Sequence, residues 1–339
     1  MKGRFFLFAV FSVLVVLACT VYTLRDFIFP KWVNIKLKVK KGESTKKLIK
    51  DLEEKGVLTS SLPAYLWVKL KNLKIKEGCY KLEGKLTAGQ ILKEFTKGYP
   101  CLVSFTIRPG DDLFSVDKTL YKKGICLKGE VLKLSKDKLF LKGLNIPFLE
   151  GYLFPDTYEI AEGTKCRRAL SVPVEEFKKK VLPLFEDYNP PALVKKALGK
   201  VDVAKILIIA SIIEKETSNE KEKPLIAGVI YNRLVRGMKL QCDPTVFYAY
   251  KMAGIEKKRL RGGEVDFPSP YNTYYIKGLP PTPICNPSIS SIKAAMYPAK
   301  TQYLYFVADN GKHLFSKSYN QHLKLIREIY RHGKALRNR

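Results

Sequence analysis

Residues 203–217 read VAKILIIASIIEKET, which has the length and composition of one buried helix. At about 100° per residue, Ile209, Ile212, Ile213 and Glu216 share one narrow stripe of that helix, whereas Glu214 lies well away from it. Aliphatic neighbours disfavour the charged form of a carboxyl group, so the stripe predicts a raised pKa for Glu216. A carboxyl group that keeps its proton near neutral pH can protonate the oxygen of a glycosidic bond. The alternative is a glutamate at a frayed helix end that faces water.

An apolar run precedes everything else in the chain. Residues 5–24 read FFLFAVFSVLVVLACTVYTL and carry no charge. A helix needs roughly 20 apolar residues to cross the hydrocarbon core of a membrane. Lys2 and Arg4 favour a cytoplasmic N-terminus. A cleaved signal peptide and a lipoprotein signal ending at Cys19 are the alternatives, but the run is long for the first and Leu17 fits the second badly. We therefore expect an uncleaved anchor and one soluble body on one side of the membrane.

Two segments after this run resemble each other. Residues 39–57 read VKKGESTKKLIKDLEEKGV and residues 107–125 read IRPGDDLFSVDKTLYKKGI. Each predicts a strand, a turn at glycine, and an amphipathic helix that is capped by a polar side chain and ends at a second glycine. The pattern is similar to LysM units, which on other proteins bind N-acetylglucosamine polymers. The alternative is a packing unit that makes no contact with sugar.

Charge and cysteine content limit the possible partners. The chain has 61 Lys and Arg against 32 Asp and Glu, a formal net charge of +29. Such a charge attracts polyanions: nucleic acid, anionic lipid or an anionic cell wall. The charges are spread along the chain, which favours solvated surfaces over a dedicated nucleic-acid face. No CxxC pair and only three His occur, so we expect no metal site. Six cysteines beyond residue 24 can pair in an oxidising compartment, with the connectivity open.

Eight stretches from residue 150 onward resemble the endolytic murein transglycosylases, the YceG-like family, and follow in that family's order. A single such motif would be weak, but eight in order are highly specific. They are EGYLFPDTY (150–158), ASIIEKET (210–217), AGVIYNRL (227–234), GMKLQCDPTV (237–246), YNTY (271–274), GLPP (278–281), AAMYPAK (294–300) and YLYFVAD (303–309).

The resemblance implies a chemistry. In this family the second glutamate of the EKET motif is catalytic, which corresponds to Glu216 and agrees with the stripe. The family cleaves the β-1,4 bond between N-acetylmuramic acid and N-acetylglucosamine within a glycan strand and leaves a 1,6-anhydro ring on the muramic acid. One carboxyl group can donate the first proton and accept the second, so no second catalytic carboxylate and no cofactor are required.

The remaining motifs are expected to form the walls of the cleft. Their amide, carboxylate, hydroxyl and aromatic groups suit sugar recognition. Asp243 has an alternative as the cap of a helix that begins at Pro244, and a structural role is as reasonable for His313. Glu150 and Asp156 are expected to be architectural. The expected substrate contacts are Gln241, Asp243, Thr245, Asn272, Thr273, Tyr274 and His313.

These observations predict an α+β protein with three parts. A cytoplasmic stub and transmembrane helix occupy residues 1–26, LysM-like units and a connector residues 33–145, and a YceG-like catalytic domain residues 146–335. We expect the enzyme to lie in the plasma (inner) membrane, to act outside the cytoplasm on peptidoglycan, and to terminate glycan strand elongation. By family analogy alone, peptidoglycan synthases are expected partners. A non-catalytic peptidoglycan-binding protein and a membrane-tethered nucleic-acid binder are the competing hypotheses, and no nucleic-acid-binding motif supports the second.

Overall fold

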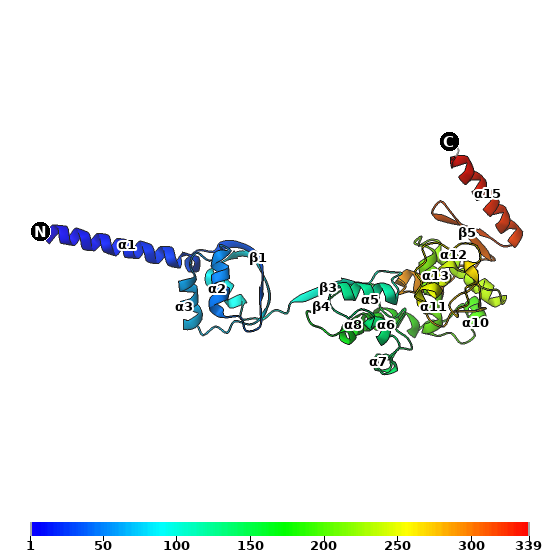
Figure 1. Ribbon diagram of the computed structural model, residues 1–339, viewed down its shortest axis with the longest axis horizontal. Coiled ribbons are helices and arrows are strands. Elements are labelled where there is room, and N and C mark those ends of the chain that lie inside the picture. Colours follow the sequence, from blue (N-terminus) through cyan, green and yellow to red (C-terminus); the bar gives the residue numbers. More distant parts are fainter. Residues whose placement is uncertain (1, 338–339) are drawn as a thin grey trace. The chain divides into compact units, whose positions relative to one another are not determined.

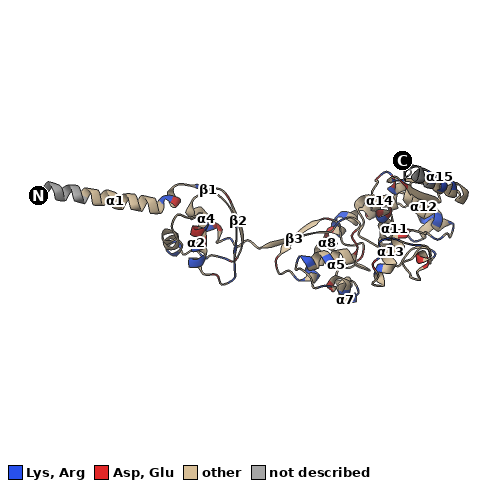
Figure 2. Ribbon diagram, turned by 45° about the horizontal axis from the view of Figure 1, so that its top comes forward, with Lys and Arg blue, Asp and Glu red and all other residues tan. Residues whose placement is uncertain are grey.

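The computed structural model describes the backbone of residues 2–337 and the side chains of residues 10–329 and 331. The architecture is mixed α+β, as expected, and it divides into two compact units, Met1–Val103 and Ser104–Arg339 (Figure 1). Within the described residues the strands pair two by two: β1 with β2, β3 with β4, and β5 with β6. Basic residues occur in both units (Figure 2).

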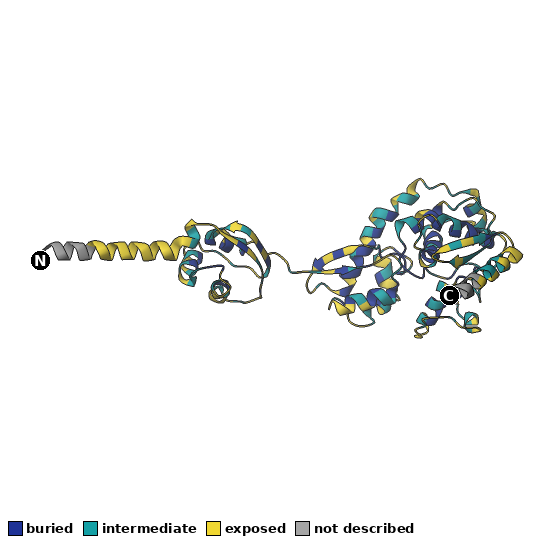
Figure 3. Cartoon of the chain, turned by 90° about the horizontal axis from the view of Figure 1, so that it is seen from above, coloured by how far each residue is buried: buried dark blue, intermediate teal, exposed yellow. Residues whose placement is uncertain are grey.

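The first helix, α1, covers Lys2–Ile28. Its segment Val10–Ile28 is long and apolar enough to cross a membrane, and none of that segment is buried against the protein (Figure 3). The prediction of a helix over residues 5–24 is therefore confirmed, and the helix continues four residues further. Its length and composition are compatible with a membrane anchor.

The rest of the first unit packs three helices against a two-stranded antiparallel sheet. Strand β1 pairs with β2 from Lys31 opposite Leu86 to Val39 opposite Gly78. Fully buried apolar side chains fill the space between helices and sheet, among them Leu52, Leu92 and Phe95. A disulfide between Cys79 and Cys101 closes the unit. The elements are β1 (Lys31–Val39), α2 (Thr45–Glu54), α3 (Ser61–Leu70), β2 (Gly78–Leu86) and α4 (Ala88–Glu94).

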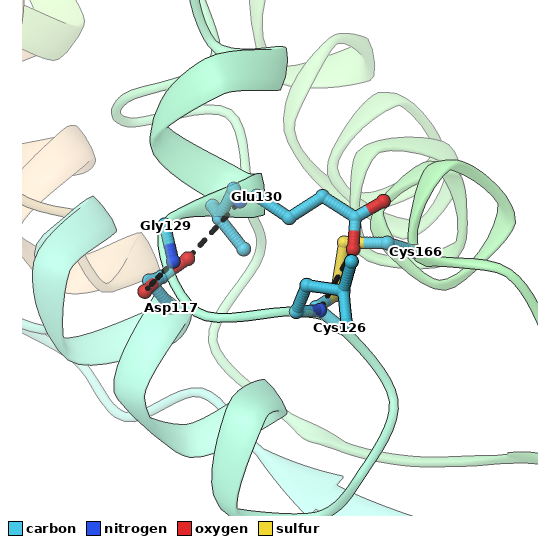
Figure 4. The surroundings of a disulfide bond; sticks show 7 residues. Asp117, Cys126, Gly129, Glu130 and Cys166 are labelled. Carbon is cyan, nitrogen blue, oxygen red and sulfur yellow. Dashed lines mark hydrogen bonds between the residues drawn. A yellow bond between two sulfur atoms is a disulfide. The ribbon is translucent and has the colours of Figure 1, made fainter.

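The second unit begins with a small helical layer around the β3–β4 pair. A disulfide between Cys126 and Cys166 joins the loop after α5 to the start of α8 (Figure 4). Glu130 lies beside this disulfide, but the two sulfur atoms are bonded to each other and are not available to a metal ion. The elements are β3 (Leu102–Thr106), α5 (Leu113–Lys122), α6 (Glu130–Leu134), α7 (Lys138–Gly143), β4 (Thr157–Ala161) and α8 (Cys166–Val181).

The C-terminal part of the second unit is built around helix α11 (Val203–Glu216). This helix packs against α12, α13 and α14, which explains why it is apolar on nearly every side. A hairpin of β5 and β6 and helix α15 follow. The remaining elements are α9 (Pro183–Glu186), α10 (Ala192–Leu198), α12 (Lys223–Val235), α13 (Asp243–Met252), the 3-10 turn η1 (Glu264–Asp266), α14 (Ile289–Met296), β5 (Tyr305–Asp309), β6 (Lys312–Ser316) and α15 (Tyr319–Arg337).

The two repeated segments have the predicted turn at glycine and capped helix, whereas the strands end at or just before the first residue of each segment: β1 ends at Val39 and β3 at Thr106. Ser44 and Asp112 cap α2 and α5 by accepting hydrogen bonds from the backbone N–H groups of Lys47 and Ser115. Gly56 and Gly124, which follow these helices, both have φ of 68°, a conformation that favours glycine. The strands find different partners, however: the strand of the first segment pairs with β2, and that of the second with β4. The similarity to LysM units and any sugar contact stay predictions.

The boundary between the compact units lies between Val103 and Ser104. The second repeated segment, residues 107–125, therefore belongs to the unit Ser104–Arg339 and not to the unit that contains the first repeated segment. The domain boundaries proposed from the sequence stay a prediction, because compactness alone does not define a functional domain.

Candidate active site

Helix α11 places Glu216 at its last turn. Asp202 caps the N-terminus of the helix by accepting a hydrogen bond of 2.9 Å from the N–H of Lys205. Ile209, Ile212 and Ile213 are fully buried, as the stripe predicted. The helix ends at Glu216 because Thr217 adopts an extended conformation, with φ of −146° and ψ of 143°. The carboxyl group thus sits where a buried helix stops.

The Glu216 carboxyl faces a cavity of about 500 Å³. The end of α11 forms one wall of this cavity, α13 another, and the N-terminus of α5 a third. A volume of this size accommodates a saccharide-sized ligand. The lining residues are Asp112, Lys215, Glu216, Asp243, Pro244, Phe247, Tyr248, Lys251, Ile255, Glu256, Lys257, Lys258 and Ile284.

The surroundings of Glu216 raise its pKa to about 7. Burial is the largest cause, and the negative charge of Asp243 adds to it. A hydrogen bond with the Cys242 thiol and the positive charge of Arg233 act in the opposite direction. The raised pKa predicted from the helical stripe is confirmed. Near neutral pH the group can therefore both give and take a proton, which is what an acid–base catalyst requires.

Glu214, the other glutamate of this helix, lies in a structural network. Its Oε2 atom accepts hydrogen bonds from the N–H of Ser288 at 3.0 Å, from the Ser288 hydroxyl, and from the Ser291 hydroxyl at 2.6 Å. The buried ammonium group of Lys223 lies 3.7 Å from the same oxygen. Glu214 therefore fixes α11 to the start of α14, and it does not line the cavity of Glu216.

Asp243 and Tyr274 form a pair at the cavity. The Tyr274 hydroxyl donates a hydrogen bond of 2.7 Å to Oδ1 of Asp243, which lines the cavity beside Glu216. The prediction that Asp243 caps the helix is wrong, since Cys242 occupies the cap position and no side chain caps the first turn. The negative charge of the Asp243 carboxylate instead raises the pKa of Glu216, and its hydrogen bond orients the Tyr274 ring.

Three of the expected substrate contacts are buried instead. Thr245, Asn272 and Thr273 are all 0% exposed. The hydroxyls of Thr245 and Thr273 lie 2.8 Å apart, and the Asn272 amide donates to the carbonyls of Val265 and Phe267. The expectation that these three side chains contact the substrate is therefore corrected. Their polar atoms already form hydrogen bonds inside the protein. They shape the loop that carries Tyr274.

Gln241 and His313 lie outside the cavity lining. Gln241 is exposed, adopts φ of 51°, and accepts a hydrogen bond of 3.3 Å from the Arg233 guanidinium. Nδ1 of His313 lies 2.7 Å from Oε2 of Glu222, and the same oxygen accepts a hydrogen bond from the Thr217 hydroxyl. His313 thus supports the residue that follows Glu216, which favours the structural alternative for this histidine.

The sequence reasoning missed the second wall of the cavity. Pro244, Phe247, Tyr248 and Lys251 line it from one face of α13, at the spacing of successive helical turns. That spacing, read from the CDPTV motif onward, was the signal that could have found them. Lys251 also forms an ion pair with Asp112, the cap of α5, so the second repeated segment contributes to the cavity wall.

Glu150 lies beneath this wall. It is only 3% exposed, and its Oε2 accepts hydrogen bonds from the N–H of Leu113 at 3.1 Å and from the Tyr248 hydroxyl at 2.8 Å. Burial raises the pKa of Glu150 to about 8. Through its two hydrogen bonds the Glu150 carboxyl group joins α5 to α13, which fits the architectural role expected for it.

Paired variants of Asp112 should separate its two functions. Replacing Asp112 by alanine removes the helix cap and leaves Lys251 without its partner, so we expect a loss of roughly 1–3 kcal/mol in the free energy of unfolding. Asp112→Asn keeps a good cap and loses only the ion pair, so it should lose less than half as much. Chemical unfolding of the full chain in detergent measures both. Equal losses in the two variants would show that the cap contributes nothing.

Together these features define a candidate acid–base site around one half-buried carboxyl group, on an α+β fold that carries a membrane-length apolar helix. The profile of the YceG-like family matches residues 37–328, so the chain belongs to this family.

Relatives in three genera are similar over most of the chain. A protein of Bacillus subtilis named endolytic murein transglycosylase is 31% identical over 310 residues, covering 86% of this chain and 83% of its own length. A protein of the same name from Streptococcus pneumoniae is 28% identical and covers the same share of this chain, which spans 57% of that relative. A crystal structure of a YceG-like protein from Listeria monocytogenes superposes with a TM-score of 0.59 at 32% identity, over 86% of this chain and 98% of its own.

Proposed function

We propose that this protein is a peptidoglycan lytic transglycosylase that cleaves the β-1,4 bond between N-acetylmuramic acid and N-acetylglucosamine and leaves a 1,6-anhydro end. The observation that carries the proposal is the Glu216 carboxyl, whose pKa is raised to about 7 at the wall of a 500 Å³ cavity. The names of its relatives supply the substrate class. The proposed physiological role is the termination of glycan strand elongation.

The mechanism needs one carboxyl group. Protonated Glu216 donates its proton to the glycosidic oxygen as the bond from that oxygen to the anomeric carbon breaks. The 2-acetamido group of the substrate stabilises the positive charge that develops at this carbon. The 6-hydroxyl of the same sugar then bonds to the anomeric carbon, and its proton passes to the Glu216 carboxylate. The acid is regenerated and no water is consumed.

Both lysines and carboxyl groups line the cavity, and the lysines offer contacts to an anionic substrate. Four lysines line it, of which Lys251 is paired with Asp112 and Lys257 with Glu264. Lys258 is exposed at the cavity. Peptidoglycan carries carboxylate groups on its stem peptides, which lysine ammonium groups attract. We propose that Asp243 and Tyr274 contact the sugar, because Asp243 lines the cavity beside Glu216 and the Tyr274 hydroxyl donates a hydrogen bond to Asp243.

The proposed location is the extracytoplasmic side of the plasma membrane, with α1 as a single-pass anchor. Two disulfides support this location, one in each compact unit, because such bonds persist in oxidising compartments. The basic residues before the apolar run favour the same orientation. Peptidoglycan synthases are proposed as partners on family analogy alone.

The product distinguishes this proposal from its rivals. The full-length chain in detergent is incubated with purified glycan strands in water enriched in ¹⁸O, and the fragments are analysed by mass spectrometry. We expect internal cleavage, 1,6-anhydro ends and no incorporation of ¹⁸O. Reducing ends that carry ¹⁸O would assign a hydrolase instead. Intact strands that co-sediment with the protein would assign a binding protein without turnover.

A further inference from the structure

Helix α3 (Ser61–Leu70) carries an apolar stripe that the protein does not cover. Leu62, Leu66 and Leu70 are 65%, 51% and 81% exposed, and they follow one another at a spacing of four residues. Residues four apart share one face of a helix, so the three leucines form one continuous row. A continuous apolar row on a surface, unlike scattered apolar residues, indicates a binding partner.

The stripe lies beside the end of the membrane-length helix. A groove of about 530 Å³ separates α3 from the last turns of α1, and its lining is almost wholly apolar. The Phe27 ring of α1 packs on the Trp67 ring of α3, with the ring centroids 5.1 Å apart. The lining residues are Thr20, Thr23, Leu24, Phe27, Ile28, Ser60, Leu62, Pro63, Leu66, Trp67 and Leu70.

Polar contacts fix the end of α1 and the start of β1 to the loop between α2 and α3, which leads directly into α3. The Thr59 hydroxyl donates a hydrogen bond of 2.7 Å to Oδ1 of Asp26, and the Thr59 N–H donates to Oδ2 of the same residue. The Arg25 guanidinium donates to the Thr59 hydroxyl at 3.1 Å, and the Lys31 ammonium to the carbonyl of Gly56 at 2.5 Å. The depth of α1 in a bilayer therefore sets the depth of α3.

We propose that the Leu62–Leu66–Leu70 stripe is a second membrane contact, immersed in the lipid leaflet next to the first unit. The groove runs along α1 from Thr20 to Ile28, a rise of roughly 12 Å at 1.5 Å per residue. This stretch is the end of the apolar segment, where the hydrocarbon core meets the headgroups. Acyl chains fill the groove, and α3 lies flat at the interface as an amphipathic helix.

The residues around the stripe match the chemistry of an anionic lipid surface. Four exposed lysines, Lys69, Lys71, Lys74 and Lys76, follow at the C-terminal end of α3, where anionic headgroups attract them. Both tryptophans of the chain, Trp32 and Trp67, lie in this unit, and aromatic side chains are enriched at membrane interfaces. We therefore infer that this face of the first compact unit contacts lipid, rather than glycan.

The inference depends on insertion of α1 in the bilayer and not on the chemistry of Glu216. A failed lipid contact would leave the transglycosylase proposal intact, and the reverse also holds.

Depth measurement by spin labelling tests the proposal on the full-length chain. A nitroxide is attached at Leu66→Cys in a Cys19→Ser background, in which the remaining free cysteines, Cys242 and Cys285, are buried. The matched control is Lys50→Cys on α2, whose side chain is 70% exposed. Both proteins are reconstituted in vesicles of phosphatidylethanolamine and phosphatidylglycerol. We expect the label at position 66 to be several-fold more accessible to oxygen and several-fold less accessible to a water-soluble nickel complex than the control.

Two outcomes would overturn the proposal. Equal nickel accessibility at positions 66 and 50 would show that the stripe lies in water. Protection at position 66 together with spin–spin broadening that disappears on dilution with unlabelled protein would assign a second copy of the chain as the partner. A label at Leu70→Cys repeats the measurement at the most exposed leucine of the stripe, where the substitution disturbs no core packing.

Discussion

Replacing Glu216 by glutamine is expected to lower kcat for glycan cleavage by roughly 10²- to 10⁴-fold, the usual contribution of general acid–base catalysis. Glutamine keeps the shape of the side chain but neither donates the first proton nor accepts the second. Because both steps of the proposed mechanism use this one group, binding of the strand should persist while turnover is lost. The measurement is the rate of release of anhydro-muropeptides by the full-length protein, together with its affinity for the uncleaved strand.

Glu159→Gln on strand β4 is the control, because that side chain is exposed and the substitution is chemically the same. It should cleave strands at the wild-type rate. If Glu216→Gln cleaves as fast as this control, Glu216 is not the catalytic acid.

The pH dependence of the wild-type reaction is an independent test of the role of Glu216. Since the free enzyme needs Glu216 protonated and its pKa is about 7, kcat/KM should fall as the pH rises above that value. The charge of Asp243 contributes to the raised pKa, so Asp243→Asn should move this fall to lower pH. An unchanged profile in Asp243→Asn would show that the charge of Asp243 does not contribute to the raised pKa of Glu216.

Local pattern was enough to predict the helix that carries the site. The period of α11 placed Glu216 with the buried isoleucines and Glu214 on another side, and both placements are confirmed. The repeated segments were also predictable, because caps and terminal glycines act within a few residues. Helix periods, caps and terminal glycines depend on residues a few positions apart, so they can be predicted from the sequence alone.

Contacts between distant residues were not predictable in the same way. Asp112 and Lys251 are 139 residues apart, and nothing local to either residue indicates the other. Polar side chains pose a related difficulty, since Thr245, Asn272 and Thr273 have the chemistry of sugar ligands and of buried loop supports alike. Only the packing decides whether their hydrogen bonds are already used. The pairing of Cys126 with Cys166 across a separation of 40 residues was likewise open.

The same Glu216→Gln substitution should make the protein more stable at alkaline pH. The pKa of Glu216 is raised from 4.5 to about 7 in the folded protein, so the folded state keeps a proton that the unfolded state releases between these values. The free energy of unfolding of the wild type therefore falls as the pH rises through that window, and the loss is complete above about pH 7. At about 1.4 kcal/mol for each pKa unit, the loss amounts to about 3 kcal/mol.

Glutamine carries no charge at any pH and avoids this loss. The variant should match the wild type near pH 4, where Glu216 is neutral in both states, and should unfold at a temperature several degrees higher near pH 8. Thermal unfolding of the full chain in detergent, followed by circular dichroism at both pH values, measures the difference, and Glu159→Gln should show none. A variant no more stable than the wild type near pH 8 would contradict the raised pKa. A variant that is equally stabilised at both pH values would point to packing instead of charge, because only the cost of ionising a buried carboxyl group changes across this window.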